Sequence, residues 1–169
     1  YGFITNLKDK SSDWLPQAGP ALVLGAGGAS RAILVSLIEA GVPKIYLSNR
    51  THQRAKDVAL QLSPLIEVID WEDKERYLSM VTTVVNTTSL GMIGKPPLEI
   101  DLSLINSKAT VTDLVYTPLE TPLLVQARSR GCSVVNGVGM LLHQAVPGFE
   151  AWFGTCPIVD SEVEALVLK

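Results

Sequence analysis

Cysteine, histidine and an excess of charge of either sign are scarce in this sequence. Its 169 residues include two cysteines and two histidines, and 14 basic residues against 17 acidic ones leave a formal net charge of −3. Without a basic surplus, neither nucleic acid nor an anionic membrane is indicated as a partner. Cys132 and Cys156 lie in apolar contexts without C-x-x-C spacing. We therefore expect buried free thiols, no metal site and a reducing, cytoplasmic location.

Long apolar runs are also missing. No stretch is long enough to span a bilayer, and the amino terminus has no basic region followed by an apolar segment of the kind that a signal peptide carries. The chain begins with Tyr1 rather than methionine, so we expect a fragment of a longer protein. A hydrophobic content of 47% with 18% charged residues is ordinary for one globular domain with a sizeable core.

A glycine-rich turn organises the first part of the chain. An apolar run at residues 21–24 is followed by Gly25-Ala26-Gly27-Gly28-Ala29-Ser30, after which apolar residues recur at helical spacing. This strand, turn and helix are typical of a phosphate-binding site, because glycines at 25 and 27 allow a close backbone approach and the first helical amides face an anion. The pattern by itself also fits a plain structural turn.

Short apolar runs alternate with amphipathic segments along the rest of the chain. The predicted strands are residues 21–24, 44–48, 66–69, 82–86, 109–115 and 133–135. The predicted helices are residues 2–12, the stretch from the glycine turn to about 40, a segment through 58 and 62, then 122–130, 138–153 and 160–169, with a helical turn at 71–76. This alternation favours a Rossmann-type doubly wound α/β fold with a mainly parallel six-stranded sheet, strand order 3-2-1-4-5-6 and helices on both faces.

Ligands of such a sheet bind beyond the carboxyl ends of the strands, where the strand order reverses. Four loops are expected to meet there, at residues 25–30, 49–54, 86–92 and 115–121.

The second of these loops predicts which dinucleotide binds. It carries Asn49-Arg50-Thr51 where an NAD-binding sheet usually has Asp or Glu. A carboxylate would repel a 2′-phosphate, whereas the guanidinium groups of Arg50 and, one helical turn later, Arg54 can bind it. Asn49 and Thr51 can add neutral donors. The loop therefore predicts NADP, and the alternative is that both arginines are solvated surface charges.

Five ordered motifs span nearly the whole chain. They are residues 25–31, Asn49-Arg50-Thr51, residues 86–92, Asp113-Leu114-Val115-Tyr116 with residues 121–124, and residues 136–141 with Gln144. Together they resemble the shikimate dehydrogenase family. The resemblance implies reversible, NADP-dependent reduction of 3-dehydroshikimate to shikimate, a step of chorismate and aromatic amino-acid biosynthesis.

The resemblance also implies roles for single residues. The pyrophosphate of NADP would be held by the glycine turn, at Gly25, Ala26, Gly27, Gly28 and Ala29, and the adenosine 2′-phosphate by Asn49, Arg50, Thr51 and Arg54. Thr88 and Leu114 would lie beside the cofactor, with Gly137 near the nicotinamide amide. Tyr116 and Gln144 would reach the substrate, although each also fits a structural role.

The sequence departs from the family pattern in its catalytic residues. Reduction of a ketone needs a proton donor at the carbonyl oxygen, and shikimate dehydrogenases use a Lys-Asp pair from an amino-terminal substrate domain, just upstream of a Gly-Phe pair. This chain starts at that pair, Gly2-Phe3, so we expect it to bind NADP(H) without turnover. Asp113 is as well placed to cap a turn as to catalyse, and a lone His143 is expected to be structural.

Residues 1–169 are thus expected to form one NADP-binding domain, as a monomer or homodimer. Its terminal helices, within residues 1–15 and 160–169, would dock on the absent substrate domain. That arrangement would leave apolar side chains of both helices exposed, namely Phe3, Leu7, Val163 and Leu166.

Three alternatives stay open. Glutamyl-tRNA reductase can carry Asn-Arg-Thr after the second strand, but it normally lacks the doubled glycine Gly27-Gly28 and would recognise a large RNA. Quinate-oxidising relatives commonly prefer NAD and place an Asp near the end of the second strand, which this chain does not. A non-catalytic dinucleotide sensor on the same fold would carry another kind of domain upstream.

Overall fold

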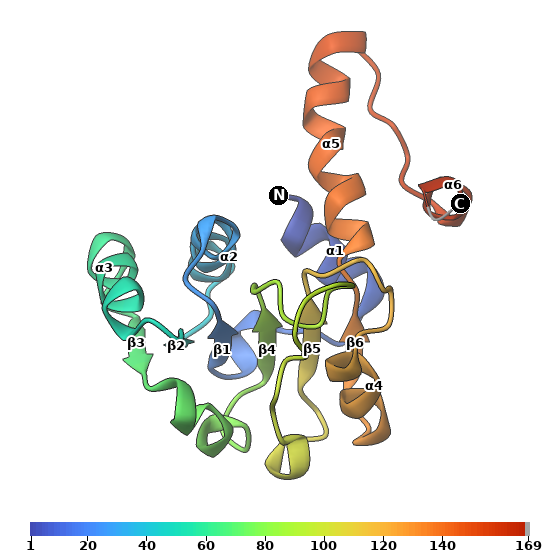
Figure 1. Cartoon of the computed structure of the whole chain (residues 1–169). Helices are drawn as coiled ribbons and strands as arrows, with labels where there is room; N and C mark the ends of the chain where they lie inside the picture. The colour runs from blue at the N-terminus through green and yellow to red at the C-terminus, as the bar shows by residue number, and fades with distance from the viewer. Residues whose placement is uncertain (168–169) are drawn as a thin grey trace.

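Six parallel strands form one sheet in the order β3-β2-β1-β4-β5-β6 in the computed structural model, which describes residues 1–167 (Figure 1). Every neighbouring pair of strands runs parallel. The strands are β1 (Ala21–Leu24), β2 (Ile45–Ser48), β3 (Ile66–Ile69), β4 (Thr83–Asn86), β5 (Thr110–Asp113) and β6 (Ser133–Val135). The predicted strand order and Rossmann-type fold are therefore confirmed.

The helices follow the predicted segments closely. The α-helices are α1 (Gly2–Lys10), α2 (Gly28–Glu39), α3 (His52–Leu62), α4 (Pro122–Ser129), α5 (Val138–Phe153) and α6 (Ser161–Val167). The 3-10 helices are η1 (Pro16–Ala18), η2 (Trp71–Tyr77) and η3 (Leu102–Leu104). Residues 168 and 169 of the last predicted helix lie outside the described residues. The helical turn predicted at 71–76 is η2, whereas η1 and η3 were not predicted.

The sheet separates two apolar cores, because alternate residues of a strand point to opposite faces. Ala21 and Val23 of β1 belong to the core that α1, α2 and α3 cover. Leu22 and Leu24 belong to the core that α4, η2 and η3 cover. All four side chains are fully buried, which explains why the central strand is a continuous apolar run rather than an alternating one.

Strand β5 ends at Asp113, two residues before the predicted end. The amide of Leu114 still donates to the carbonyl of Asn86 on β4 (3.0 Å). The next available amide, that of Val115, donates instead to the Asp113 carboxylate (3.0 Å). Because a side chain takes over the hydrogen bonding at this point, the chain leaves the sheet and a loop begins.

Helix α1 is buried within the domain, which corrects the expectation that its apolar side is exposed. Phe3 and Leu7 lie in the core beneath α2 and α3. The helix packs mainly against α5. Two glycines allow the close approach: a Cβ on Gly2 would lie 2.7 Å from the backbone nitrogen of Gln144, and one on Gly139 would overlap Asn6 Oδ1.

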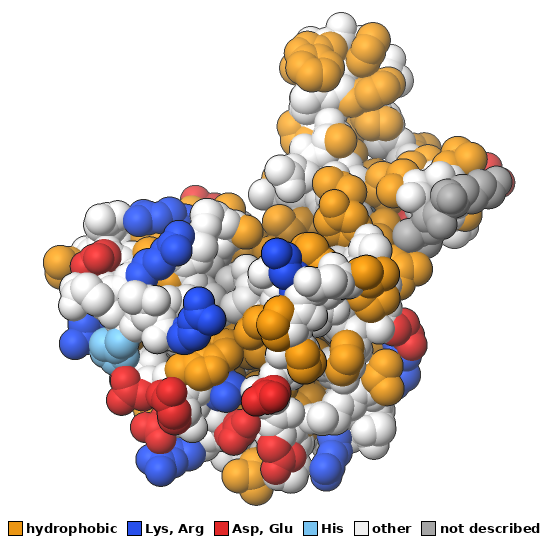
Figure 2. Space-filling view, viewed as in Figure 1, with side chains coloured by type: hydrophobic (Ala, Val, Ile, Leu, Met, Phe, Trp, Pro, Cys, Tyr) orange, Lys and Arg blue, Asp and Glu red, His pale blue; other side chains and the backbone are white. Residues whose placement is uncertain are grey.

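Helix α5 rises beyond the sheet (Figure 1), and apolar side chains gather on its outer part (Figure 2). Trp152 is 82% exposed and Phe153 is 65% exposed. In α6, Leu166 is exposed as expected, whereas Val163 is half-buried. The carboxy-terminal part of the chain therefore carries the apolar surface that α1 does not.

The two cysteines differ in their surroundings. Cys132 is buried, as expected, and burial raises the pKa of its thiol. Cys156 is exposed, so the expectation of a buried thiol is wrong there, because it lies in the irregular segment between α5 and α6. Among residues 1–167, no helix has the length and apolar character needed to cross a membrane.

The contact between α1 and α5 yields a first prediction. Gly139→Ala is expected to lower the free energy of unfolding by about 1–3 kcal/mol, because the added methyl group overlaps buried Asn6. Gly148→Ala in the same helix is the matched control, since no described atom lies within 4 Å of its Cβ. It should be neutral or gain up to about 1 kcal/mol. Urea unfolding measures both, and equal stabilities would contradict the close packing.

Candidate functional site

The turn between β1 and α2 is shaped by one close contact. Gly25 has a φ of +103°, and a Cβ there would lie 2.7 Å from Thr87 Oγ1. On the other side of the turn, no described atom lies within 4 Å of a Cβ built on Gly27 or Gly28. Helix α2 begins there without a side-chain cap. Its first amides carry the positive end of the helix dipole and are available to an anion.

Asn49 connects this turn to the loop after β2. Its Oδ1 accepts from the amide of Ala26 (3.0 Å), and its Nδ2 donates to the carbonyl of Thr51 (2.9 Å). The Ala26 amide is therefore already bonded, and Asn49 fixes the geometry of the loop. Arg50 and Arg54 are exposed, and within the described part of the chain neither forms an ion pair or a side-chain hydrogen bond. Two unpaired positive charges thus stand at the end of β2.

Three of the predicted cofactor residues, Asn49, Arg50 and Thr88, line one groove of about 500 Å³. Trp71, which follows β3, and Lys95, in the connection between β4 and β5, line it as well. The groove therefore lies at the carboxyl ends of the strands, beside the β1–β4 pair where the strand order reverses. It combines two cationic side chains with an aromatic ring, a composition suited to an anionic ligand with a flat ring.

The loop after β4 is held by its own side chains. Buried Asn86 accepts with Oδ1 from the amide of Thr88 (3.0 Å) and from Thr88 Oγ1 (2.7 Å). The same hydroxyl accepts from the amide of Leu90 (3.1 Å). Because the Thr88 hydroxyl is bonded within the loop, the position of Thr88 in the groove is fixed before any ligand arrives.

Asp113 is fully buried at the end of β5. Its Oδ1 accepts from Asn86 Nδ2 (2.9 Å) and from the amide of Val115 (3.0 Å), and its Oδ2 accepts from Thr121 Oγ1 (2.7 Å). Burial raises the pKa of this carboxyl, and the three hydrogen bonds oppose that rise. Both carboxylate oxygens are occupied by groups of neighbouring loops, so the turn-capping role is confirmed. A proton-transfer role at the mouth of the site, the open side of the groove at the carboxyl ends of the strands, is not supported.

Leu114, predicted to lie beside the cofactor, and Gly137, predicted near the nicotinamide amide, lie against each other. Gly137 precedes α5, and a Cβ there would overlap the carbonyl oxygen of Leu114. The turn between β6 and α5 is also held by Asn6 of α1, whose Nδ2 donates to the carbonyl of Asn136 (2.9 Å). The structure therefore brings the loop after β5 and the start of α5 together at one point.

The two predicted substrate residues, Tyr116 and Gln144, are both exposed. Within the described residues neither side chain forms a hydrogen bond, so both remain available to a ligand. The neighbouring His143 is buried, with Nε2 3.0 Å from Asp9 Oδ2. This pair ties α5 to α1, which confirms the structural role expected for His143.

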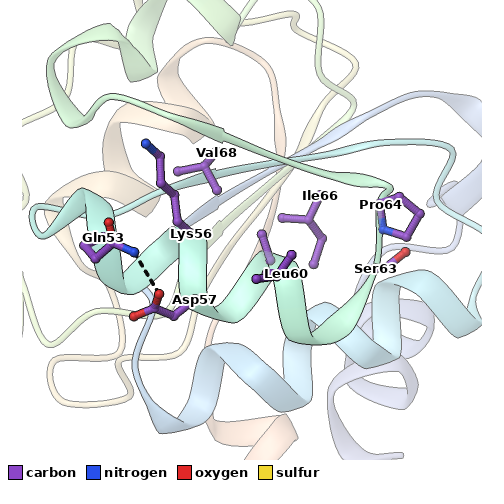
Figure 3. A pocket seen from close by; sticks show the side chains of 9 residues that line it. Gln53, Lys56, Asp57, Leu60, Ser63, Pro64, Ile66 and Val68 are labelled. Carbon is purple, nitrogen blue, oxygen red and sulfur yellow. Dashed lines mark hydrogen bonds between the residues drawn. The ribbon is translucent and has the colours of Figure 1, made fainter.

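A second groove, of about 590 Å³, lies at the outer edge of the sheet between α3 and β3 (Figure 3). Lys56, Leu60 and Val68 line it, and Gln53 Nε2 donates to Asp57 Oδ1 (2.9 Å) beside it. None of the predicted site residues lines this groove. The groove at the carboxyl ends of the strands is therefore the candidate site, although it is slightly smaller.

Comparison with known proteins identifies relatives of the whole chain. Residues 11–93 match the family model of shikimate / quinate 5-dehydrogenases. The shikimate dehydrogenase (NADP(+)) of Paracoccus denitrificans is 51% identical over 168 residues, which cover 99% of this chain and 60% of that protein. The enzyme of the same name from Cereibacter sphaeroides is 54% identical over 167 residues, with the same coverage.

A solved structure is similar over the same extent. Quinate dehydrogenase from Corynebacterium glutamicum, in complex with NAD, superposes with a TM-score of 0.89 at 29% identity, covering 99% of this chain and 60% of that one. Nearly the whole chain is therefore similar to shikimate and quinate dehydrogenases. It spans about 60% of the length of the curated relatives that it matches. This similarity over 99% of the chain favours a shikimate or quinate dehydrogenase over the glutamyl-tRNA reductase alternative.

Two residues of the groove, Trp71 and Lys95, were not singled out from the sequence. Trp71 follows the third strand, so its place at a strand end was a signal that could have been used. Lys95 lies in the Gly94–Pro97 connection, which has no helix or strand periodicity. Only the fold brings Lys95 to Arg50.

The glycine turn yields a second prediction. Gly25→Ala is expected to lower the free energy of unfolding by about 1–3 kcal/mol, because the positive φ and the contact with Thr87 both exclude a methyl group. Gly28→Ala faces open space and should stay within about 0.5 kcal/mol of the wild type. Thermal or urea unfolding of the two variants checks this. A destabilised Gly28→Ala variant together with a stable Gly25→Ala variant would contradict the close contact at Gly25 and the open space at Gly28.

Proposed function

We propose that this chain is the NADP-binding domain of a shikimate dehydrogenase, which reversibly reduces 3-dehydroshikimate to shikimate with NADPH. The observation that carries the proposal is Arg50, exposed, unpaired among the described residues and placed after β2 in the groove that Asn49 and Thr88 share. A guanidinium at this point suits the 2′-phosphate that distinguishes NADP from NAD. The names of the relatives from Paracoccus and Cereibacter support the same cofactor.

The residues at the mouth fit the phosphate groups of NADP. The uncapped amides of Gly28 and Ala29 suit the pyrophosphate, and the open space at Gly27 leaves room for it. Arg50 and Arg54 suit the 2′-phosphate from the loop after β2. The cofactor would thus extend from the end of β2, across the glycine turn, toward the loop after β5.

The nicotinamide end would meet Leu114 and Gly137, which the close contact at Gly137 holds together. When bound, NADPH supplies the hydride. Tyr116 and Gln144 are exposed and would orient the substrate. Neither Asp113 nor His143 is placed to give a proton to the substrate, since both are buried and already bonded. We therefore propose that residues outside this chain supply the proton and that the chain alone binds cofactor without turnover.

The choice of cofactor is tested with Arg50→Ala. The variant is expected to lose about 1.5–3 kcal/mol of binding free energy for NADP and almost none for NAD, because only NADP presents a charged group to this side chain. Arg31→Ala is the matched control, since Arg31 is an exposed arginine that donates to Gln61 Oε1 (2.8 Å). Calorimetric titration of both cofactors measures the difference. Equal losses for the two cofactors would contradict the assignment.

The reaction is tested by following NADPH oxidation with 3-dehydroshikimate. The chain of residues 1–169 is expected to bind NADPH but not oxidise it, because Asp113 and His143 are buried and already bonded and so cannot protonate the substrate. A longer protein that contains this chain and a substrate domain should oxidise NADPH much faster than NADH. Turnover by residues 1–169 alone would refute the first statement. A longer protein that binds NADPH but reduces nothing would favour the sensor alternative.

A quinate-oxidising enzyme is the second candidate, because the quinate dehydrogenase of Corynebacterium glutamicum shares the fold with a TM-score of 0.89. Its complex contains NAD. Because position 50 is an arginine rather than a carboxylate, we expect this chain to favour NADP over NAD. The ratio of shikimate to quinate oxidation by the longer protein, with each cofactor, decides between the two.

A further inference from the structure

The buried carboxylate of Asp113 lies where three separate segments meet. It receives hydrogen bonds from Asn86 at the end of β4, from Val115 in the loop after β5, and from Thr121 before α4. No cationic side chain among the described residues pairs with it. Burying a carboxylate that is held only by neutral donors lowers the free energy of unfolding relative to an apolar residue. A positioning role, which an apolar residue could not supply, would account for its presence here.

On one side, Asp113 fixes the loop after β4 through Asn86. Asn86 uses its Nδ2 for Asp113 and for the carbonyl of Leu90 (3.2 Å), and its Oδ1 for the amide and hydroxyl of Thr88. The orientation of this amide side chain therefore sets the position of Thr88. Removing the acceptor at 113 would take away one of the four hydrogen bonds that orient the Asn86 amide and so loosen the loop that carries Thr88.

On the other side, Asp113 fixes the loop after β5. The bond to Val115 sets the chain direction directly after Leu114, whose carbonyl lies against Gly137. Thr121 bonds to the second carboxylate oxygen while its hydroxyl accepts from the amide of Leu124 at the start of α4 (3.4 Å). The two loops also meet further out, where the amide of Ile93 donates to the carbonyl of Thr117 (3.0 Å).

We propose that Asp113 is a positioning residue that holds the loops after β4 and β5 at a set separation and so shapes the nicotinamide half of the cofactor site. The adenosine half depends on Asn49, Arg50 and Arg54. Among the described residues, none of these side chains forms a hydrogen bond with Asp113, Asn86, Thr88 or Thr121, although Asn49 and Arg50 share the groove with Thr88. The inference rests on the proposed binding of NADP. It predicts that the two halves of the site respond differently to a change at position 113.

The test compares NADPH with 2′,5′-ADP, which keeps the adenosine and its 2′-phosphate but has no nicotinamide. Asp113→Ala in the chain of residues 1–169 is expected to raise the Kd for NADPH about tenfold or more, because three donors lose their acceptor, and to change the Kd for 2′,5′-ADP by less than about twofold. The fluorescence of bound NADPH should also shift toward that of the free cofactor. Asp113→Asn retains an acceptor for Asn86 and Val115 and should restore most of the affinity.

Two further variants keep the comparison informative. Asp101→Ala removes a carboxylate that accepts from Ser103 at the start of η3, away from the mouth, and should alter neither ligand. If Asp113→Ala does not fold, Thr121→Val removes one bond to Asp113 and should show the same split between ligands, with Thr121→Ser as the conservative rescue.

Each outcome decides the proposal. A selective loss for NADPH supports it. Equal losses for both ligands, or no loss in a folded variant, would mean that Asp113 serves the fold alone and would overturn it. If the wild type binds 2′,5′-ADP but not NADPH, the positioning role fails while the 2′-phosphate assignment stands. If the wild type binds neither ligand, the proposed function itself fails and this inference falls with it.

Discussion

The close approach of the β1–α2 turn to the end of β4 is the contact on which the site depends. Thr87 Oγ1 donates to the carbonyl of Leu24 (2.8 Å), and Gly25 leaves no side chain between the two segments. This contact holds β1 and β4 together where the strand order reverses and directs the start of α2 into the opening. The groove, the uncapped amides and the loop after β2 all take their positions from it.

The distribution of charge follows from the same geometry. The chain carries a formal net charge of −3, yet the groove at the mouth is lined by Arg50 and Lys95. The carboxylate of Asp113, at the end of β5, is buried and bonded to neutral donors, so it is separated from solvent. An anionic ligand therefore meets positive charge locally although the protein as a whole is acidic, and overall charge is a poor guide to this site.

Local sequence patterns were enough to predict the sheet. Short strands rich in apolar or β-branched residues alternate with helices, and the glycine turn marks the first strand, so the order follows from general rules of chain connection. The burial of α1 could not be predicted in this way, since it depends on Gly2 and Gly139, which are far apart in sequence. The position of Lys95 in the groove could not be predicted either. Asn49 was expected to donate to the ligand, but its side-chain amide binds two backbone groups.

The two ends of the proposed cofactor site differ in how firmly they are built. At the adenosine end, exposed arginines with no described partner can adjust their side chains to a phosphate. An imperfect fit there would weaken cofactor binding without displacing the reacting atoms. Toward the nicotinamide end, a buried hydrogen bond fixes the chain beside Leu114, and Gly137 makes a contact that admits only glycine. Thr88, which shares the groove with Arg50, is held by hydrogen bonds to Asn86. Hydride transfer depends steeply on the distance and alignment of the reacting atoms. Buried hydrogen bonds at one end of the proposed site and exposed charges at the other would thus suit the hydride transfer that we propose for the longer protein.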